Sequence, residues 1–260
     1  MGQRNSQKEL KEDGMNQFFV EPAQIHDKKI VITGKDVNHI KNVLRMKVGE
    51  ELSVSNGWDG KEYRGIIEEF TEDEVICALA FVKEDGVELP SRVYLYQGLP
   101  KADKMELIIQ KAVELGVHEV IPVATKRAVV KLDEKKSKSK ITRWQAISEA
   151  AAKQSKRGII PKVAEVLSFK EALKDCQRAK IRVIPYELAE GMDKTKEIIG
   201  SLKPGEDVAI FIGPEGGFDE SEIEAAIETG ITPITLGKRI LRTETAGFTI
   251  LSWIMYQLES

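Results

Sequence analysis

Cysteine and histidine are scarce in this chain of 260 residues, which has two of the first and three of the second. Cys77 and Cys176 lie far apart in the sequence and belong to no spaced motif. Such a pair makes neither a disulfide framework nor a cysteine-based metal cluster, and it is typical of a reducing compartment. The histidines are equally scattered. We therefore expect a cytoplasmic protein that binds no metal.

Long apolar runs are also lacking. No run approaches the roughly 20 residues that span a bilayer, and residues 1–14 lack the apolar stretch of a secretory signal. A hydrophobic content of 42% and a charged content of 31% are ordinary for a soluble globular protein. We expect no membrane association, and the length suffices for two modest domains.

Charge of one sign is not in excess overall, since the formal net charge is −3, but the average hides an asymmetry. Residues 126–157 contain eleven Lys or Arg against three acids. Alone, this run fits a solvated loop and helix face as well as a surface that contacts phosphates, where clustered cations release counterions. Its pattern predicts a mobile basic loop followed by a helix near Ile141–Lys153.

The composition changes along the chain in a way that predicts two domains. Residues 15–84 contain short β-rich runs separated by turn signals such as Asn56-Gly57, with a single amphipathic helix over Lys35–Arg45, and this predicts a small β-barrel. Residues 85–91 are polar and predict a linker. Residues 92–260 alternate strands and helices, which is the pattern of a mostly parallel sheet in an α/β domain.

The expected elements of the second domain are defined by local signals. Helices are expected over 101–116, over 218–230, where Asp219 and Glu222 form a capping box, and from Glu244 to about Leu258. The last of these is apolar around nearly its whole circumference. Because such a helix must be covered on all sides, we expect a second copy of the chain to pack on it. This predicts a homodimer.

Two loops that follow predicted strands indicate a ligand site. The loops are "GPEGG" at Gly213–Gly217 and "LGKRILRTETA" at Leu236–Ala246. Ligands of open α/β sheets bind beyond the carboxyl ends of strands, and glycines let backbone amides approach them. The spacing fits neither a dinucleotide-binding nor a nucleoside triphosphate motif. Lys101 and Lys104, on the helix over 101–116, are expected on a solvated face.

These loops carry a family resemblance. "FIGPEGGFDESEI" and "LGKRILRTETA" resemble the signature of the RsmE family of bacterial small-subunit ribosomal RNA methyltransferases, and "GLPKADKMELIIQKAVELGV", "KRAVVKLD" and "HIKNVLRMKVGE" are also similar to it. The resemblance covers residues 15–260 in order. It implies a SPOUT-type α/β fold with a C-terminal trefoil knot, after a PUA-like RNA-binding barrel. Residues 1–14 have no counterpart, so they are either a start assigned too early or a disordered extension.

The resemblance also implies a reaction and its partners. It implies S-adenosylmethionine as methyl donor, 16S rRNA of the small ribosomal subunit as substrate, methylation at N3 of a uridine, and a homodimer. The residues expected to bind the donor are Gly213, Glu215, Gly216, Gly217, Leu236, Gly237, Ile240 and Leu241. The residues expected to contact RNA are His39, Arg45, Lys126, Arg127, Lys131, Arg143, Lys153 and Arg157.

Methyl transfer from a sulfonium is an in-line displacement, so the enzyme mainly positions donor and acceptor. The uridine N3–H must lose its proton, and Arg242 is expected to stabilise the anion that develops on the ring oxygens. Glu215 or Glu244 could accept the proton, and the sequence does not choose between them. Neither cysteine lies in a motif, which disfavours a covalent cysteine mechanism.

Two alternatives keep the same fold. One is a SPOUT methyltransferase that acts on another RNA base or on a ribose 2′-hydroxyl, and the other is an RNA-binding assembly factor without catalysis. The resemblance over the whole chain disfavours the first. The intact pair of loops disfavours the second.

Overall fold

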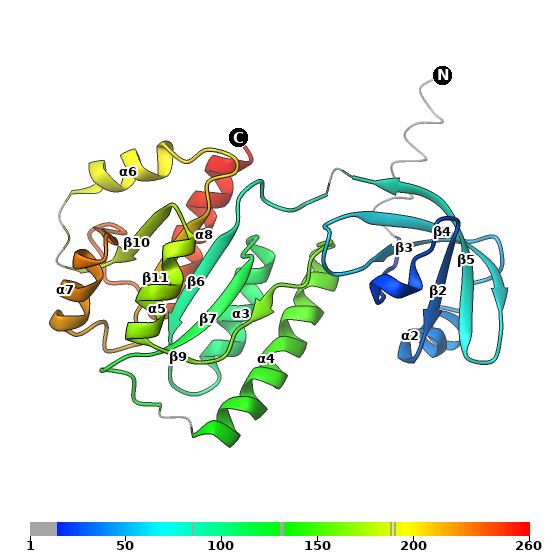
Figure 1. The fold of residues 1–260 in the computed structure, drawn as a ribbon, viewed down its shortest axis with the longest axis horizontal. Coiled ribbons are helices and arrows are strands. Elements are labelled where there is room, and N and C mark those ends of the chain that lie inside the picture. Colours follow the sequence, from blue (N-terminus) through cyan, green and yellow to red (C-terminus); the bar gives the residue numbers. More distant parts are fainter. Residues whose placement is uncertain (1–14, 85, 131–132, 188, 190) are drawn as a thin grey trace. The chain divides into compact units, whose positions relative to one another are not determined.

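The chain folds into two compact units, in a computed structural model that describes residues 15–84, 86–130, 133–187, 189 and 191–260. The first unit extends to Glu88 and also includes Lys156–Ile160, and the second contains Leu89–Ser155 and Pro161–Ser260 (Figure 1). The barrel unit therefore takes in a short segment from the part of the chain that the sequence analysis assigned to the second domain. The predicted leader, residues 1–14, lies outside the described residues.

The first unit is a mixed five-stranded sheet in the order β1-β3-β4-β5-β2, in which only the β1–β3 pair is parallel among the described strands. Its elements are β1 (Gln17–Phe19), the 3₁₀ turn η1 (Pro22–Gln24), β2 (Lys29–Thr33), β3 (Glu51–Ser55), β4 (Glu62–Phe70) and β5 (Glu74–Lys83). Apolar residues alternate along the strands, so one face buries a core around Ile30, Ile32, Leu52 and Val54.

The helix expected over Lys35–Arg45 is present in two parts. The α-helical turn α2 (Lys35–Asn38) continues directly as the π-helical turn η2 (His39–Val43). The wider turn is closed by the Leu44 N–H, which donates to the His39 carbonyl at 2.9 Å. Arg45 ends it in the left-handed region with φ 54°. Val37 and Ile40 are buried in the core, whereas His39 and Arg45 are exposed.

The second unit is built on a parallel sheet in the order β12-β10-β11-β6-β7-β8, with β9 also paired to β7. Its strands are β6 (Val93–Gly98), β7 (Glu119–Ala124), β8 (Lys162–Val163), β9 (Leu167–Ser168), β10 (Ile181–Pro185), β11 (Val208–Ile212) and β12 (Thr232–Ile234). Every residue of β6 and β11 is buried, as expected for central strands covered on both faces. The predicted parallel α/β domain is confirmed.

Helices cover both faces of this sheet (Figure 1). They are α3 (Lys104–Glu114), α4 (Glu134–Gln154), α5 (Phe169–Asp175), the 3₁₀ turn η3 (Cys176–Arg178), α6 (Met192–Gly200), α7 (Glu220–Glu228) and α8 (Thr243–Leu258). One face packs Tyr96 and Phe211, stacked at 4.5 Å between ring centroids, against α5 and α7. Helix α8 packs against α3 and β11.

Helix α4 corrects the prediction of a mobile basic loop. The expected helix over Ile141–Lys153 begins earlier, at Glu134. Asp133 caps it, because its carboxylate accepts a hydrogen bond from the Lys136 N–H at 2.8 Å. The lysines at 135–140 are therefore held on a helix.

The other two predicted helices are present. The capping box of α7 is confirmed, with Asp219 and Glu222 each bonded to the other's backbone. Helix α8 buries Ile250, Leu251 and Ile254 and leaves Tyr256 74% exposed. Over the described ranges, we find no helix with the length and apolarity that a membrane crossing requires. The trefoil knot stays a prediction.

Candidate active site

The carboxyl ends of β6, β7, β11 and β12 meet at one edge of the parallel sheet, where α/β proteins bind their ligands. Thr243, the first residue of α8, ties this edge together. Its hydroxyl donates to the Gly213 carbonyl at 2.6 Å and accepts from Gln97 Nε2 at 2.9 Å. The loop after β11, the end of β6 and the start of α8 are thereby fixed side by side.

The GPEGG loop lies against the end of β6 without space for a side chain. A Cβ atom on Gly98 would lie 2.6 Å from Pro214 Cδ and 2.8 Å from Pro214 N. The loop itself turns through a bond from the Gly217 N–H to the Pro214 carbonyl, and Gly217 has a φ of 66°. The backbone of this loop is therefore placed by contact with Gly98, a residue that the sequence analysis did not single out.

Lys104 joins three elements of the site. Its Nζ lies 3.1 Å from Glu215 Oε1, in the GPEGG loop, and 3.3 Å from Glu244 Oε2, in the first turn of α8. The Lys101 N–H donates to both oxygens of Glu215 at 3.2 Å. The expectation of a solvated face was therefore wrong for Lys104, because its partners come from segments more than a hundred residues away in the sequence. The Lys101 side chain is exposed as expected, and it is the backbone N–H of this residue that bonds Glu215.

These contacts lower the pKa of the Glu215 carboxyl. Its partial burial acts to raise the pKa of the carboxyl, but backbone hydrogen bonds and the hydrogen bond and charge of Lys104 outweigh that effect. The pKa of Glu215 is therefore below its usual value, and the pKa of Lys104 is raised, mainly by its hydrogen bond with Glu215. The pair remains ionised at neutral pH, so Glu215 is a weak base.

The loop between β12 and α8 presents its backbone to the same edge. Gly237 has a φ of 111°, a conformation that other residues rarely adopt. Lys238 and Arg239 form bends, and the amides of residues 238–241 donate no backbone hydrogen bond among the described residues. Ile240 is 88% exposed. This loop therefore offers amide donors and an apolar side chain to a ligand.

Two buried acceptors also lie at this edge. Gln97 Oε1, at the end of β6, and Thr125 Oγ1, just after β7, have no hydrogen-bond partner in the described part of the chain. Burying a polar atom without a partner costs free energy, and exceptions are concentrated at functional sites. Together with the amides of residues 238–241, these atoms fit a polar ligand that is bound through both donors and acceptors.

The three residues considered for catalysis lie at or beside this edge. Arg242 is exposed at the N-terminus of α8, and its carbonyl accepts from the Ala246 N–H at 2.8 Å. Glu244 pairs with Lys104, and no ion pair between Arg242 and Glu244 occurs among the described residues. Apart from the ionic contact with Lys104, Glu244 Oε2 is buried without a hydrogen bond in that same set.

Of the residues expected to contact RNA, Lys126 and Arg127 lie beside the GPEGG loop. Lys126 Nζ donates to Ser221 Oγ at 2.5 Å, and Arg127 donates to the Gly216 carbonyl at 3.4 Å. Both cations lie 3.6 Å from the carboxylate of Asp219. They are exposed, so they present positive charge beside the candidate ligand site.

The remaining residues of that set fall in several places. Arg143 is exposed on α4 and pairs with Glu106 on α3 at 2.8 Å, and Lys153 lies near the end of α4. His39 and Arg45 belong to the barrel unit. Lys131 lies outside the described residues.

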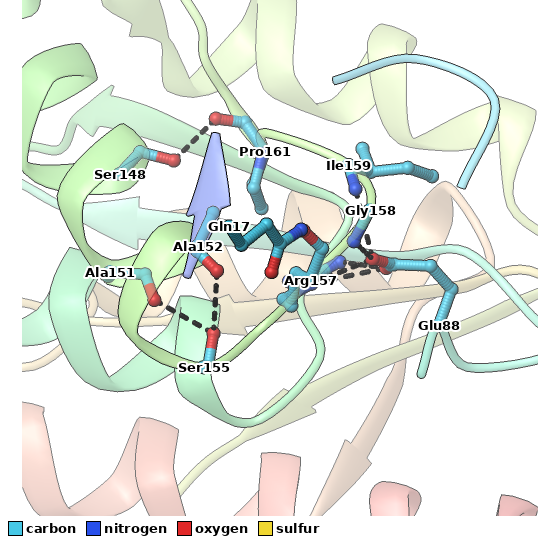
Figure 2. Close-up of polar contacts among 10 residues, drawn as sticks. All are labelled: Gln17, Glu88, Ser148, Ala151, Ala152, Ser155, Arg157, Gly158, Ile159 and Pro161. Carbon is cyan, nitrogen blue, oxygen red and sulfur yellow. Dashed lines mark hydrogen bonds and ion pairs between the residues drawn. The ribbon is translucent and has the colours of Figure 1, made fainter. Parts of the chain in front are cut away.

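Arg157 requires a correction. It is only 4% exposed, and its guanidinium pairs with Glu88 within the barrel unit, as Figure 2 shows. A phosphate could reach it only by breaking this buried pair. Its place in the basic run gave no sign of this, because the partner comes from a distant part of the sequence.

Both cysteines are buried and unsuited to nucleophilic catalysis. Burial raises the pKa of the Cys77 thiol to about 12 and that of the Cys176 thiol to about 11. The reactive thiolate is therefore scarce at neutral pH. This agrees with the expectation that the chemistry does not proceed through a cysteine.

Two family models match the chain. Residues 87–255 match a model described as RNA methyltransferase domain. Residues 32–79 match a model described as RNA methyltransferase PUA domain. The second match lies within the predicted barrel, residues 15–84, and the first begins within the predicted linker, residues 85–91.

Relatives match nearly the whole chain. The ribosomal RNA small subunit methyltransferase E of Bacillus subtilis (strain 168) is 41% identical over 251 residues, covering 94% of this chain and 98% of the relative. The protein of the same name in Mesomycoplasma hyopneumoniae (strain 232) is 34% identical over 239 residues, covering 92% and 98%.

Solved structures of similar proteins contain a bound cofactor. A putative methyltransferase from Legionella pneumophila, in complex with the cofactor SAM, has a TM-score of 0.78 and 31% identity, covering 93% of this chain and 97% of that one. A ribosomal RNA small subunit methyltransferase E from Neisseria gonorrhoeae, bound to S-adenosyl methionine, has a TM-score of 0.77 and 28% identity, with the same coverage of each chain.

Proposed function

Because the chain belongs to the family of ribosomal RNA small subunit methyltransferase E, we propose that it methylates 16S rRNA of the small ribosomal subunit at N3 of a uridine. The predicted fold class, a SPOUT-type α/β domain after a PUA-like barrel, is confirmed by this membership. The observation that carries the proposal is that family similarity over 94% of the chain coincides with a sheet edge built to bind a polar ligand.

The residues at this edge fit S-adenosylmethionine as the methyl donor. Unbonded amides of residues 238–241 and the buried acceptors of Gln97 and Thr125 would meet its polar groups, and Ile240 would cover apolar surface. The predicted donor-binding residues lie in the two loops concerned: Gly213, Glu215, Gly216, Gly217, Leu236, Gly237, Ile240 and Leu241. When bound, the donor supplies an electrophilic methyl group on a sulfonium.

Three residues of the chain are assigned to charge stabilisation, positioning and proton transfer. Arg242 is exposed beside the loops and keeps its charge at any working pH, so it would stabilise negative charge on a uracil oxygen as N3 loses its proton. Glu215 is a weak base held by Lys101 and Lys104, so we assign it to positioning. Glu244 contacts Lys104 at 3.3 Å but accepts no hydrogen bond from the Lys101 amide that also holds Glu215, and we propose it as the proton acceptor.

RNA would be bound by the exposed cations beside this edge, by cations on α4 and by the barrel unit. We propose the exposed Lys126, Arg127 and Arg143 and the partly buried Lys153 as phosphate contacts, with His39 and Arg45 contributing from the barrel unit. A phosphate contact at Lys131 stays a prediction. If Lys126 and Arg127 contact phosphates, their joint replacement by Ala should weaken RNA binding and reduce its dependence on salt concentration.

We also propose a cytoplasmic homodimer. Trp253 and Met255 are partly exposed on α8, and Tyr256 is 74% exposed. Apolar side chains on one helix that the protomer leaves uncovered favour packing against a second copy.

The experiment that tests the function has two parts. Calorimetry measures whether the protein binds S-adenosylmethionine, and the methyl group is then mapped on small subunits purified from a strain that lacks the gene. A methyl group at uridine N3 supports the proposal. A methyl group on another base or a 2′-hydroxyl supports a different acceptor, and binding of RNA without any transfer supports an assembly factor.

A further inference from the structure

Trp58 is the most exposed tryptophan of the described chain. Its side chain is 79% exposed, whereas Trp144 is 3% exposed and Trp253 is partly buried. One exposed apolar residue needs no explanation in itself. What distinguishes Trp58 is that hydrogen bonds on both sides fix the backbone of its loop.

The loop that carries Trp58, residues 56–60, is fixed by hydrogen bonds of its own residues Asn56 and Asp59. Asn56 Oδ1 accepts from the Trp58 N–H at 3.0 Å and from the Asp59 N–H at 3.1 Å, and Asn56 Nδ2 donates to Asp59 Oδ2 at 2.8 Å. The Tyr63 hydroxyl donates to the same oxygen at 2.6 Å. Burial and the contact with Asp59 raise the pKa of Tyr63 to about 12, so this bond persists at physiological pH.

The same loop is also held by the segment Lys156–Ile160, which belongs to the same unit. The Ile160 N–H donates to the Gly57 carbonyl at 3.1 Å, and Gly57 forms a parallel bridge with Ile159. The backbones touch, because a Cβ atom on Gly158 would lie 2.5 Å from the Gly60 carbonyl oxygen. The loop therefore cannot fold back without displacing this segment.

Glu88 holds the segment in turn. Its carboxylate accepts from the N–H groups of Gly158 and Ile159 at 3.1 Å and pairs with the guanidinium of Arg157 (Figure 2). Gln17 Nε2 donates to the Arg157 carbonyl at 2.9 Å. Removing one partner of such a buried pair is strongly destabilising. The buried Arg157 thus supports the loop that presents Trp58.

We propose that Trp58 is a stacking platform for an unpaired nucleobase of the RNA substrate. An aromatic ring on a fixed loop loses little entropy on binding, and stacking on aromatic side chains is how proteins hold single-stranded bases. The loop lies within residues 32–79, which match the RNA methyltransferase PUA domain model, so RNA is favoured over a protein partner. The inference rests on the proposed function in taking RNA as the substrate.

Fluorescence tests the stacking directly. A single-stranded RNA oligonucleotide should quench the emission of the wild-type protein, and the same sequence annealed to its complement should quench it much less, because its bases are already stacked. Trp58→Phe should abolish the quenching, because it removes the tryptophan on which the base stacks. The emission of Trp144 and Trp253, which remain in the variant, is the background. Equal quenching in wild type and Trp58→Phe, or by both RNA forms, would overturn the proposal.

Affinity for the same oligonucleotide gives a second readout. Trp58→Ala should weaken binding by roughly 5- to 150-fold, the range for one stacked base, whereas Trp58→Phe should retain most of the affinity. Phe81→Ala is the matched control, since Phe81 is a 53% exposed aromatic residue of the same unit. Wild-type affinity in Trp58→Ala, or an equal loss in Phe81→Ala, would contradict the proposal.

These outcomes separate the inference from the proposed function. Quenching and loss of affinity need no methyl transfer, so they can succeed even if the enzyme proves inactive. Conversely, methylation at uridine N3 together with unchanged RNA binding by Trp58→Ala would leave the function standing and overturn only the stacking role. Because Trp58 and Phe81 are exposed, Trp58→Phe, Trp58→Ala and Phe81→Ala should all keep the wild-type melting temperature. Thermal unfolding of each variant checks that it is folded.

Discussion

Replacing Gly98 with Ala tests whether the candidate site depends on close contact between β6 and the GPEGG loop. Gly98 is buried at the end of β6 and does not have a positive φ, so alanine meets no backbone strain there. The added Cβ would lie 2.6 Å from Pro214 Cδ and 3.2 Å from the carbonyl carbon of Gly213. Ordinary contacts begin at 3.4 Å. The loop must therefore retreat by roughly 1 Å, since close-packed interiors have little free space.

This displacement has a calculable cost. Overpacking by one methyl group in a closely packed site typically costs about 1–3 kcal/mol. For a protein of this size that lowers the melting temperature by roughly 2–12 °C. A shift of about 1 Å at the site can lower the rate of methyl transfer by up to roughly 100-fold. Thermal unfolding, calorimetry with S-adenosylmethionine and single-turnover methylation measure the three effects.

Gly247→Ala is the matched control. Gly247 lies within α8, and its Cβ would lie 3.9 Å from Ile212 Cγ1, an ordinary contact. Alanine in a helix interior is more stable than glycine by about 0.5–1 kcal/mol, so this variant should be as stable as wild type or slightly more so. If Gly98→Ala binds the donor and melts like wild type, the close contact at Gly98 does not place the loop and the reasoning is refuted.

Three further substitutions test the charges and the interface. Lys104→Met should weaken donor binding increasingly as the pH falls from about 7 to about 5, because the pKa of Glu215 rises once the ammonium is lost and the carboxylate is then protonated. Calorimetry across pH checks this, and the control Lys111→Met, on the same helix, should show no such dependence. Arg242→Ala should slow methyl transfer about 10²–10³-fold in single-turnover assays, and a rate within a few-fold of wild type would remove it from the mechanism. Trp253→Glu should give a dissociated or aggregating protein by sedimentation, and a monomeric wild type at micromolar concentration would contradict the dimer.

The sequence by itself determined the features that depend on near neighbours. Short β-rich runs separated by turn signals marked the strands of the barrel unit, and the alternation of strands and helices marked the parallel sheet. The capping box of Asp219 and Glu222 was visible because both partners lie within one helical turn. The two glycine-bearing loops marked the edge of the sheet at which the candidate site lies.

Only the tertiary structure decided which residues meet at the site and in the barrel unit. Lys104 was expected in solvent, because nothing near it in the sequence shows that Glu215 and Glu244 lie within 3.3 Å. Arg157 was expected on a basic surface, but it is buried beside Glu88. The two-residue strands β8 and β9 were missed because they are too short to show a period. In each case the deciding contact joins segments far apart in the chain, and side-chain periodicity reports only local geometry.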